Sequence, residues 1–537
     1  MSTLKSKILV SDDVSASGLQ PLREAGFVVD KQTGLSPDEL CLALADCAGL
    51  VVRSETKVTA AVMEAARNLR VIGRAGVGVD NIDVGAATAR GIVVMNAPDG
   101  NTITTAEHTM ALLVSLARNV PQANLSVKTG EWERKRFIGA ELSSKTLGII
   151  GLGRIGRAVA ARARGFGMKI VGHDPFIAPE QARELDIETA TLDEVYARAD
   201  FLTIHTPMTT ETRALIGVEA FAKLKPGVRI INCARGGLVD EKALYDAIIS
   251  GKVAGAALDV WEQEPPPRDH PLLGLDQVIV TPHLGASTTE AQEGVAFTVA
   301  EQMRDFLSTG ALRGAVNVPP MSSKELNALQ PYLSLAESLG RFQAQLVTGA
   351  VSEVKIEFAG AMVDLDAAPV TRAFLAALLR GVSSRVNLVN AFLIAEERRI
   401  AVTTTYVRGS ATAPAIRTGV VTESGEQTAS GSVFGVAGGN HEGRITEIND
   451  FRIEAIPRGH MLVMHSRDVP GVIGQVGTLL GEAGVNISAF HLGRWQRGGE
   501  ALAVIEVDAP AGIETLGVLR SLDEVISIKP IELAVDR

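Results

Sequence analysis

The sequence predicts an α/β protein with parallel sheets, followed by two smaller α+β parts, and three features carry this prediction. From Lys7 to Val94, short apolar runs alternate with helical segments, which is typical of a parallel α/β layer. A glycine-rich turn at residues 151–156 joins an apolar run to an Ala- and Arg-rich helical segment. Residues 461–528 read as strand, helix, strand, strand, helix, strand, and this βαββαβ order is ferredoxin-like.

The first layer is expected to contain five strands, which are the runs KILVSD, FVVDK, GLVVRS, LRVIGRAG and GIVVMN. A helix is expected from Asn101, ahead of the glycine turn. Later strands are expected within the apolar runs at residues 168–172, 201–207, 227–237, 253–261 and 278–283. The tips of such strands share the edge where doubly wound sheets bind ligands. A helix at residues 290–307 should cross back to the first layer.

A linker is predicted at Val318-Pro319-Pro320, because prolines end regular structure. Residues 321–455 mix helical and strand-like stretches without a catalytic constellation. In the last part we expect strands at residues 461–465, 485–492, 501–507 and 525–528, with a helix at 472–483.

Composition narrows the class of protein. The chain has 537 residues, 46% of them hydrophobic, and at about 150 residues per domain this length allows three or four domains. Its net charge is −10 and its basic residues are dispersed, which argues against a nucleic-acid surface. The three cysteines form neither a CxxC pair nor a disulfide framework, as in a reducing cytosol. We find no signal peptide or membrane span and expect a soluble, cytoplasmic protein that does not bind membranes.

The glycine turn has the pattern of a dinucleotide-binding site. Gly151 permits the tight turn, Gly153 lets a pyrophosphate approach the backbone, and Gly156 lets the helix pack on the strand. The start of that helix offers free N–H groups to the phosphates. The next apolar run ends at Asp174, where a carboxylate would accept from the ribose hydroxyls and repel a 2′-phosphate. The expected cofactor is therefore NAD rather than NADP.

Three side chains with complementary chemistry stand at successive strand tips. Arg235 lies in NCARGG, Glu264 in LDVWEQEP and His283 in TPHLGAST. A histidine can take the hydroxyl proton of an alcohol as hydride leaves. A glutamate can fix the tautomer of that imidazole, and an arginine can bind a carboxylate and polarise the nascent carbonyl. These residues predict a dehydrogenase.

These three motifs resemble the signatures of the D-2-hydroxyacid dehydrogenase family, whose catalytic residues fall on Arg235, Glu264 and His283. The stretches VVRSETKVT, GRAGVGVDNID, WERKRF and RDVPGVIGQVG are similar to the long form of that family. The resemblance implies NAD-dependent oxidation of D-3-phosphoglycerate to 3-phosphohydroxypyruvate, the first step of L-serine biosynthesis, by a homodimer or homotetramer. Two alternatives are another D-2-hydroxyacid dehydrogenase, such as a glyoxylate or hydroxypyruvate reductase, and a non-enzymatic NAD-sensing binding protein.

The resemblance also implies a domain plan. A Rossmann-type NAD domain (residues 99–288) is inserted in a flavodoxin-like substrate domain (1–98 and 289–318). An α+β intervening domain (319–455), similar to allosteric substrate-binding domains, and a βαββαβ ACT regulatory domain (456–537) follow.

Further site residues follow from the resemblance. The substrate positions are Arg53, Ser54, Arg74, Gly76, Val77 and Asn101, with Arg134 supplied by a neighbouring subunit. The cofactor positions, beyond those named above, are Arg154, Ile155, Thr206, Cys233, Ala234, Asp259 and Gly285. The histidines lack metal-ligand spacing, so we expect no metal.

The C-terminal module is expected to sense an amino acid, with L-serine as the effector. The loop from Asp468 to Gly471 precedes a helix, whose N–H groups suit a carboxylate. Asn486 would act from a paired domain across a symmetric interface. Ser466 stands where some serine-responsive relatives carry an aromatic residue, and the alternative is an oligomerisation module without a ligand.

Overall fold

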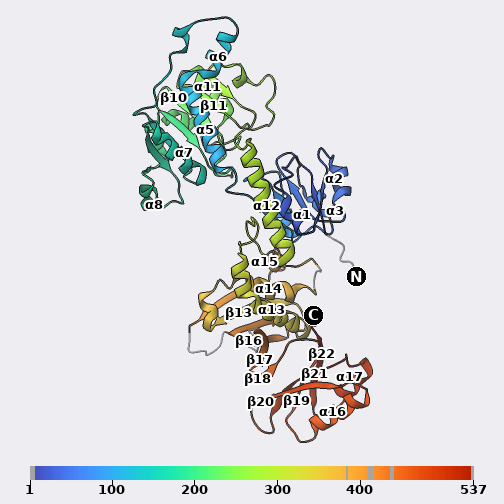
Figure 1. The fold of residues 1–537 in the computed structure, drawn as a ribbon. Helices are drawn as coiled ribbons and strands as arrows, with labels where there is room; N and C mark the ends of the chain where they lie inside the picture. Colours follow the sequence, from blue (N-terminus) through green and yellow to red (C-terminus); the bar gives the residue numbers. More distant parts are fainter. Residues whose placement is uncertain (1–5, 382–384, 409–414, 436–440, 534–537) are drawn as a thin grey trace.

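The structure is a computed structural model that describes residues 6–381, 385–408, 415–435 and 441–533. The molecule is elongated and contains four β-sheets, numbered here in the order of the sequence (Figure 1). The second sheet lies at one end and the fourth at the other, while the first and third lie between them. None of the helices in the described ranges combines the length and the hydropathy needed to span a lipid bilayer.

The first sheet is parallel, with the strand order β2-β1-β3-β4-β5. This is the strand order of a flavodoxin-like sheet, which agrees with the domain type implied by the family resemblance. Its strands are β1 (Lys7–Val10), β2 (Val28–Lys31), β3 (Cys47–Val52), β4 (Val71–Arg74) and β5 (Val93–Asn96). Its helices are α1 (Gln20–Glu24), α2 (Pro37–Leu44), α3 (Ala60–Ala65) and α4 (Val84–Ala89). The long helix α12 (Thr289–Thr309) also packs on this sheet, as its predicted return to the first layer requires.

The second sheet is a seven-stranded parallel sheet in the order β12-β11-β10-β9-β6-β7-β8. The order reverses at β6, as in the Rossmann fold. Its strands are β6 (Thr146–Ile150), β7 (Lys169–His173), β8 (Glu188–Thr189), β9 (Phe201–Ile204), β10 (Val228–Asn232), β11 (Val253–Leu258) and β12 (Val278–Val280). Its helical segments are α5 (Thr102–Arg118), α6 (Val120–Lys128), η1 (Arg134–Phe137), α7 (Arg154–Gly165), α8 (Pro179–Glu184), α9 (Leu192–Arg198), α10 (Val218–Lys223), α11 (Glu241–Ile249) and η2 (Pro271–Gly274).

Two mixed α+β layers complete the chain. The third sheet, in the order β14-β13-β15-β16-β17-β18, consists of β13 (Val351–Ala359), β14 (Ala401–Val407), β15 (Ala415–Thr422), β16 (Gly425–Gly435), β17 (His441–Ile448) and β18 (Phe451–Ala455). Its helical segments are α13 (Ser323–Leu346), η3 (Gly360–Asp364), α14 (Ala368–Leu379) and α15 (Ala391–Glu397). The fourth sheet, in the order β20-β21-β19-β22, consists of β19 (His460–Arg467), β20 (Ile487–Arg494), β21 (Glu500–Val507) and β22 (Val525–Glu532), with α16 (Val472–Glu482) and α17 (Ile513–Arg520). Its βαββαβ order confirms the sequence prediction.

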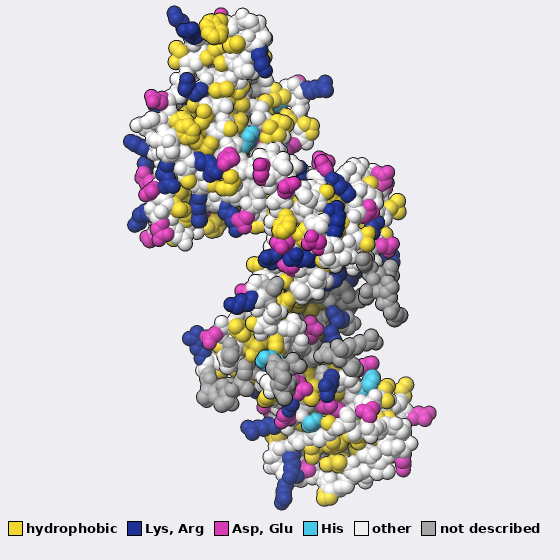
Figure 2. Space-filling view, in the orientation of Figure 1, with side chains coloured by type: hydrophobic (Ala, Val, Ile, Leu, Met, Phe, Trp, Pro, Cys, Tyr) yellow, Lys and Arg dark blue, Asp and Glu magenta, His cyan; other side chains and the backbone are white. Residues whose placement is uncertain are grey.

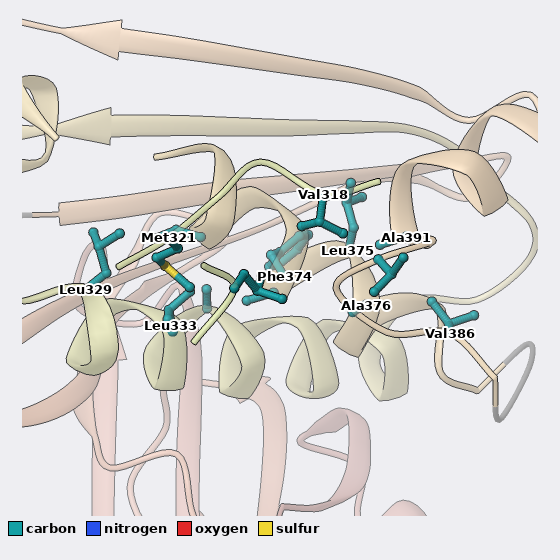
Figure 3. Close-up of a cluster of buried hydrophobic side chains, with 14 of the residues drawn as sticks. Val318, Met321, Leu329, Leu333, Phe374, Leu375, Ala376, Val386 and Ala391 are labelled. Atoms are coloured by element: carbon teal, nitrogen blue, oxygen red, sulfur yellow. The ribbon is translucent and has the colours of Figure 1, made fainter. Parts of the chain in front are cut away.

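One hydrophobic core runs through three of the four sheets. It extends from Ile8 in β1 and Met303 in α12 to Phe374 in α14 and Met461 in β19. Figure 3 shows its middle part, where Val318 from the predicted linker and Met321 just after it lie among side chains of α13 and α14. The second sheet has its own clusters on its two faces, and the first and fourth sheets each have one further separate cluster.

Candidate active site

The predicted cofactor and catalytic residues follow the carboxyl ends of neighbouring strands in the second sheet. They are Gly151 after β6, Asp174 after β7, Thr206 after β9, Cys233 to Arg235 after β10, Asp259 after β11 and His283 after β12. Asn232 is in register with Ile204 and Leu258, and Leu258 is in register with Val280. Four strand ends are therefore level, and the residues that follow them share one edge of the sheet.

These strands are shorter than the apolar runs predicted. The run at residues 201–207 gives a strand that ends at Ile204, and the run at 227–237 gives one that ends at Asn232. The polar and small residues at the tips leave the sheet as loops, which lets their side chains turn over the ligand edge.

The glycine turn leaves an open approach to the start of α7. Gly151 has φ +92°, and a Cβ there would lie 2.6 Å from the His205 carbonyl oxygen. A Cβ on Gly156 would collide with the backbone oxygen of Gly151, whereas a Cβ on Gly153 would meet nothing within 4 Å. Gly153 precedes α7 without a side-chain cap. The first N–H groups of the helix are thus free to bind a pyrophosphate, which fits the predicted dinucleotide.

Asp174 lies half-buried beside this turn. Its Oδ2 accepts a 2.8 Å hydrogen bond from Leu152 N, and its Oδ1 accepts one of 2.9 Å from Phe176 N. Because a carboxylate oxygen has two lone pairs, each oxygen can still accept from a ribose hydroxyl. Arg154, at the start of α7, forms an exposed 2.5 Å ion pair with Asp99, and Ile155 packs on the core below.

His283 and Glu264 form a hydrogen-bonded pair. His283 Nδ1 lies 2.8 Å from Glu264 Oε2, and Glu264 Oε1 accepts from Trp261 N at 3.1 Å. Burial raises the pKa of Glu264, but the bonds from His283 and Trp261 outweigh it and leave that pKa below its ordinary value. The carboxylate is therefore charged at neutral pH. Because Nδ1 of His283 is hydrogen-bonded to the carboxylate, its Nε2 is the ring nitrogen that can accept a proton from a substrate.

The pair borders a cavity of about 350 Å³. Its walls are mostly apolar, and they consist of Trp261, Glu264, Pro265, Pro266, Leu273, Val280, Thr281, Pro282 and His283.

Asp259 holds the loop that carries His283. Its backbone oxygen accepts from His283 N at 2.9 Å, and the histidine has a left-handed φ of 54°, a conformation that persists only where surrounding contacts enforce it. The fully buried Asp259 carboxylate accepts from Leu284 N at 2.7 Å and Gly285 N at 2.9 Å. His108 of α5 lies 3.1 Å from the same carboxylate.

Cys233 lies close to this cluster. Burial, followed by the charge of Asp259, raises the pKa of its thiol to about 12. Potential ligand atoms of His108, Cys233 and Asp259 lie within 4.8 Å of one another.

Three arginines meet near the loops after β3, β4 and β10. The pKa of Arg74 is lowered to about 10, first by burial and then by the charge of Arg235. Arg74 Nε donates to the Arg53 carbonyl oxygen at 3.2 Å. Arg235 Nε donates to Asp80 Oδ2 at 3.0 Å. Excess positive charge therefore gathers between the first and second sheets, where an anionic substrate would be attracted.

A buried carboxylate shapes the loop that carries Arg53 and the exposed Ser54. Asp12, 2% exposed, accepts from Arg53 N at 2.5 Å and from Thr56 N at 3.0 Å. The loop after β4, which carries Gly76 and Val77, is held by Asn96. The side-chain amide of Asn96 donates to the Val77 carbonyl oxygen at 2.5 Å.

The remaining predicted positions differ in their surroundings. Thr206 Oγ1 and Asn101 Oδ1 are buried without a hydrogen-bond partner among the described residues. Ala234 donates its N–H to Asn232 Oδ1 at 3.1 Å. Arg134 lies in the exposed segment after α6, and its guanidinium lies 5.7 Å from the Trp132 ring centroid. No recorded contact within the described ranges joins Arg134 to the other substrate positions.

The two predicted effector residues lie at opposite ends of the fourth sheet. Asp468 follows β19 and accepts from Arg494, at the end of β20, at 2.8 Å. Asn486 precedes β20 and donates to Asp508, after β21, at 2.7 Å. Ser466 is buried in β19. One chain does not bring Asp468 and Asn486 together, so a shared site requires a second copy.

Sequence reasoning did not identify the partners that contact the site residues from distant parts of the chain. Asp80 and Arg235 are separated by 155 positions, and His108 and Asp259 by 151. The sequence does show Asp80 within GRAGVGVDNID and Asp12 after the first strand. Neither position indicates which residue the carboxylate contacts.

Comparison with known families agrees with this geometry. Residues 110–285 match the NAD binding domain of D-isomer specific 2-hydroxyacid dehydrogenases. Residues 328–449 match the D-3-phosphoglycerate dehydrogenase intervening domain, and residues 460–524 match the ACT domain.

Similar proteins span the whole chain or its first part. D-3-phosphoglycerate dehydrogenase of Archaeoglobus fulgidus is 43% identical over 98% of this chain and 100% of its own length, and that of Bacillus subtilis is 43% identical over 98% and 99%. A glyoxylate reductase structure from Paecilomyes thermophila matches with a TM-score of 0.54 and 31% identity, covering 58% of this chain and 99% of that one. A D-lactate dehydrogenase structure from Aquifex aeolicus, complexed with NAD and lactic acid, matches with a TM-score of 0.51 and 28% identity over 57% and 96%. The chain is an NAD-dependent D-2-hydroxyacid dehydrogenase that belongs to the D-3-phosphoglycerate dehydrogenase family.

Proposed function

We propose that this protein oxidises D-3-phosphoglycerate to 3-phosphohydroxypyruvate with NAD, the first step of L-serine biosynthesis. The observation that carries the proposal is the 2.8 Å bond between His283 Nδ1 and Glu264 Oε2, at the same edge of the second sheet as Arg235. The names of the full-length relatives support the choice of substrate. The intervening and ACT regions distinguish the chain from shorter hydroxyacid dehydrogenases such as the glyoxylate reductase.

His283 is the general base of the proposed reaction. Its Nε2 takes the proton of the substrate hydroxyl while Nδ1 stays bonded to Glu264. The resulting imidazolium is stabilised by the carboxylate, which is charged because its pKa is lowered. In the reverse direction His283 returns the proton to the carbonyl oxygen.

The arginines bind the two anionic ends of the substrate. Arg235 binds the carboxylate beside the reacting carbon and polarises the nascent carbonyl. Arg53 and Arg74 bind the phosphate with Ser54 and the backbone at Gly76 and Val77, and Asn101 lines the cleft. The hydrogen bond from Arg74 Nε to the Arg53 backbone oxygen, at 3.2 Å, ties Arg74 to the loop that carries Arg53 and supports this assignment.

NAD fits the edge of the second sheet. Gly153 leaves room for the pyrophosphate, and Asp174 keeps lone pairs for the ribose. The unpartnered Thr206 Oγ1 offers a further polar atom, and Cys233, Ala234, Asp259 and Gly285 lie where the nicotinamide end would reach. NAD supplies the acceptor for the substrate hydride. Asp259 Oδ1 receives bonds from His108, Thr281 and Leu284, and Oδ2 receives one from Gly285, so this buried carboxylate holds the loops at the nicotinamide end.

A substrate panel at fixed NAD concentration tests the proposed reaction. We expect NADH formation with D-3-phosphoglycerate at a much higher kcat/KM than with D-glycerate. A preference for reducing glyoxylate or hydroxypyruvate would favour the reductase alternative. Binding of NADH without turnover of any of these acids would favour the NAD-sensing alternative.

The active unit is proposed to be a homodimer or homotetramer, with Arg134 reaching a neighbouring subunit. Val120, Leu125, Val127, Trp132 and Ile138 are exposed large apolar side chains around α6, and Figure 2 shows hydrophobic side chains on the end of the molecule where α6 lies. Monomeric proteins rarely expose such a cluster. Sedimentation should give a dimer or larger species, and Trp132→Arg should shift it toward the monomer; a monomeric wild-type enzyme would contradict the proposal.

The C-terminal module is proposed to bind L-serine between two copies. Each copy would supply Asp468 at one end of its sheet and Asn486 at the other, which is the arrangement that a two-fold axis can bring together. Calorimetry with the full chain should show serine binding that Asn486→Ala abolishes. The absence of binding at millimolar serine would leave the module a structural one.

The domain boundaries at residues 98/99, 288/289, 318/319 and 455/456 are part of this proposal. The division of the strands among four sheets supports them. A cytoplasmic location is also proposed, supported by three free cysteines.

A further inference from the structure

The guanidinium of Arg235 is held from the first sheet, although the residue follows a strand of the second. Its Nε donates to Asp80 Oδ2 at 3.0 Å, and Asp80 lies in the loop after β4. Its Nη1 donates to the Ala234 carbonyl oxygen at 2.7 Å. Among the described residues no hydrogen-bond acceptor is recorded for Nη2, which leaves that nitrogen for a substrate.

The same loop contains the space that this guanidinium occupies. A Cβ built on Gly78 would fall on Arg235 Nη2 and, at 2.7 Å, against Asp80 Oδ2. Gly78 does not have a positive φ, so a methyl group here would not strain the backbone but would displace the flexible end of Arg235 from its present place. Gly76 also lies against a guanidinium, because a Cβ there would fall on Arg74 Nη1, but it has a positive φ of 157° as well. The segment from Gly76 to Gly78 thus forms two hollows, one for each guanidinium.

The charges explain why a carboxylate belongs at this point. Arg74 is close enough to Arg235 for their charges to repel, which contributes to the lowered pKa of Arg74, whereas Asp80 favours its charged form. One carboxylate beside two guanidiniums permits both to stay charged and leaves a net positive charge for an anion.

The Asp80–Arg235 pair is too exposed to serve folding. The side chain of Asp80 is 63% exposed and that of Arg235 is 30% exposed, and ion pairs in water contribute little to stability. We infer that the pair instead orients the Arg235 side chain, since hydrogen bonds at two of its nitrogens fix the plane of the guanidinium.

We propose that Asp80 and Gly78 are positioning residues for the reaction, which aim Arg235 at the substrate across the gap between the two sheets. This inference rests on the proposed role of Arg235 in binding the substrate carboxylate. Because the anchor and the arginine belong to different sheets, Arg235 has its productive orientation only when the sheets lie as close as they do here.

The test uses Asp80→Asn and Gly78→Ala. Both should lower kcat/KM for D-3-phosphoglycerate by about 10- to 100-fold, the effect of misplacing a binding group by about an ångström. The NADH dissociation constant and the melting temperature of Asp80→Asn should stay at wild-type values. Asp193→Asn is the matched control, because it removes a similarly exposed carboxylate, 64% exposed, from its ion pair with Lys223. Gly85→Ala is the control for Gly78, since a Cβ there meets only Asp83 at 3.6 Å.

A double-mutant cycle with Arg235→Lys separates positioning from a structural effect. If Asp80 acts through Arg235, adding Asp80→Asn to Arg235→Lys should cause little further loss of kcat/KM. Losses that multiply in the double variant, or wild-type kcat/KM in Asp80→Asn, would overturn the positioning role. Wild-type kcat/KM in Arg235→Lys would instead overturn the proposed role of Arg235 and this inference with it.

Discussion

The glycine turn gives a prediction in which folding and cofactor binding respond to different substitutions only three residues apart. A methyl group on Gly153 meets nothing within 4 Å, while one on Gly156 meets the backbone oxygen of Gly151. The first substitution adds a group to open space where the pyrophosphate would lie. The second adds it to a packed contact between α7 and the turn, and a backbone oxygen cannot rotate aside.

The expected magnitudes follow from these surroundings. Gly153→Ala should raise the NADH dissociation constant at least about tenfold, a loss of about 1.4 kcal/mol. Its folding cost should be about 1 kcal/mol, since Ala is a poorer N-cap than Gly. Gly156→Ala should cost about 1–3 kcal/mol through overpacking. At about 2–4 °C per kcal/mol for a domain of this size, its melting temperature should fall by about 2–12 °C.

NADH fluorescence titration and thermal unfolding without cofactor measure the two effects separately. Gly165→Ala, in the last turn of the same helix, is the control because its Cβ also meets nothing within 4 Å. It should keep NADH affinity and melt no lower than the wild type. NADH affinity at the wild-type level in Gly153→Ala would refute the placement of the pyrophosphate, and an unchanged melting temperature in Gly156→Ala would refute the packing argument.

Four further predictions concern the catalytic and substrate residues. His283→Ala should lower kcat by about 10²–10⁴-fold with NADH affinity intact, as for loss of a general base; near-wild-type initial rates would sink the mechanism. Asp174→Ala should weaken NAD and narrow its preference over NADP, measured as the ratio of the two kcat/KM values, and a wild-type preference for NADP would contradict this assignment. Arg74→Ala should raise the KM for D-3-phosphoglycerate far more than that for NAD, because it removes a charged donor to the phosphate; equal increases would argue against it. The pKa of Glu264 is lowered below 4.5 in the folded state. Its contribution to the free energy of unfolding is therefore present above pH 4.5 and is lost as the pH falls through the folded pKa. The difference in the free energy of urea unfolding between wild type and Glu264→Gln should shrink below pH 4.5, and a difference that grows there would contradict this reasoning.

The sequence was sufficient to predict features that local patterns encode. Parallel strands leave their apolar periodicity in the chain, and the residues at their tips can be read directly, so the fold class is confirmed. The bond between His283 and Glu264 agrees with the predicted pairing of their roles. Such pairs can be inferred because both residues come from neighbouring strands of one sheet.

Contacts between different sheets produce no comparable pattern in the sequence. The ion pair of Asp80 with Arg235 depends on how closely the first two sheets approach, which no periodicity records. The separation of Asp468 from Asn486 follows from the pairing of β19 and β20 on either side of β21. The sequence shows both residues beside strands, but only the register shows that they lie at opposite ends.

The continuous hydrophobic core has a consequence for the cooperativity of unfolding. The first, third and fourth sheets share one cluster of buried side chains, although the first and fourth each keep a further cluster of their own. Loss of packing in the shared cluster exposes apolar surface in all three sheets, so these three should unfold as one unit. The second sheet buries its two faces within itself, which makes it a separate unit in the same polypeptide. A ligand bound at its glycine turn stabilises that unit through mass action, while the larger unit gains only what is transmitted through the few contacts between them.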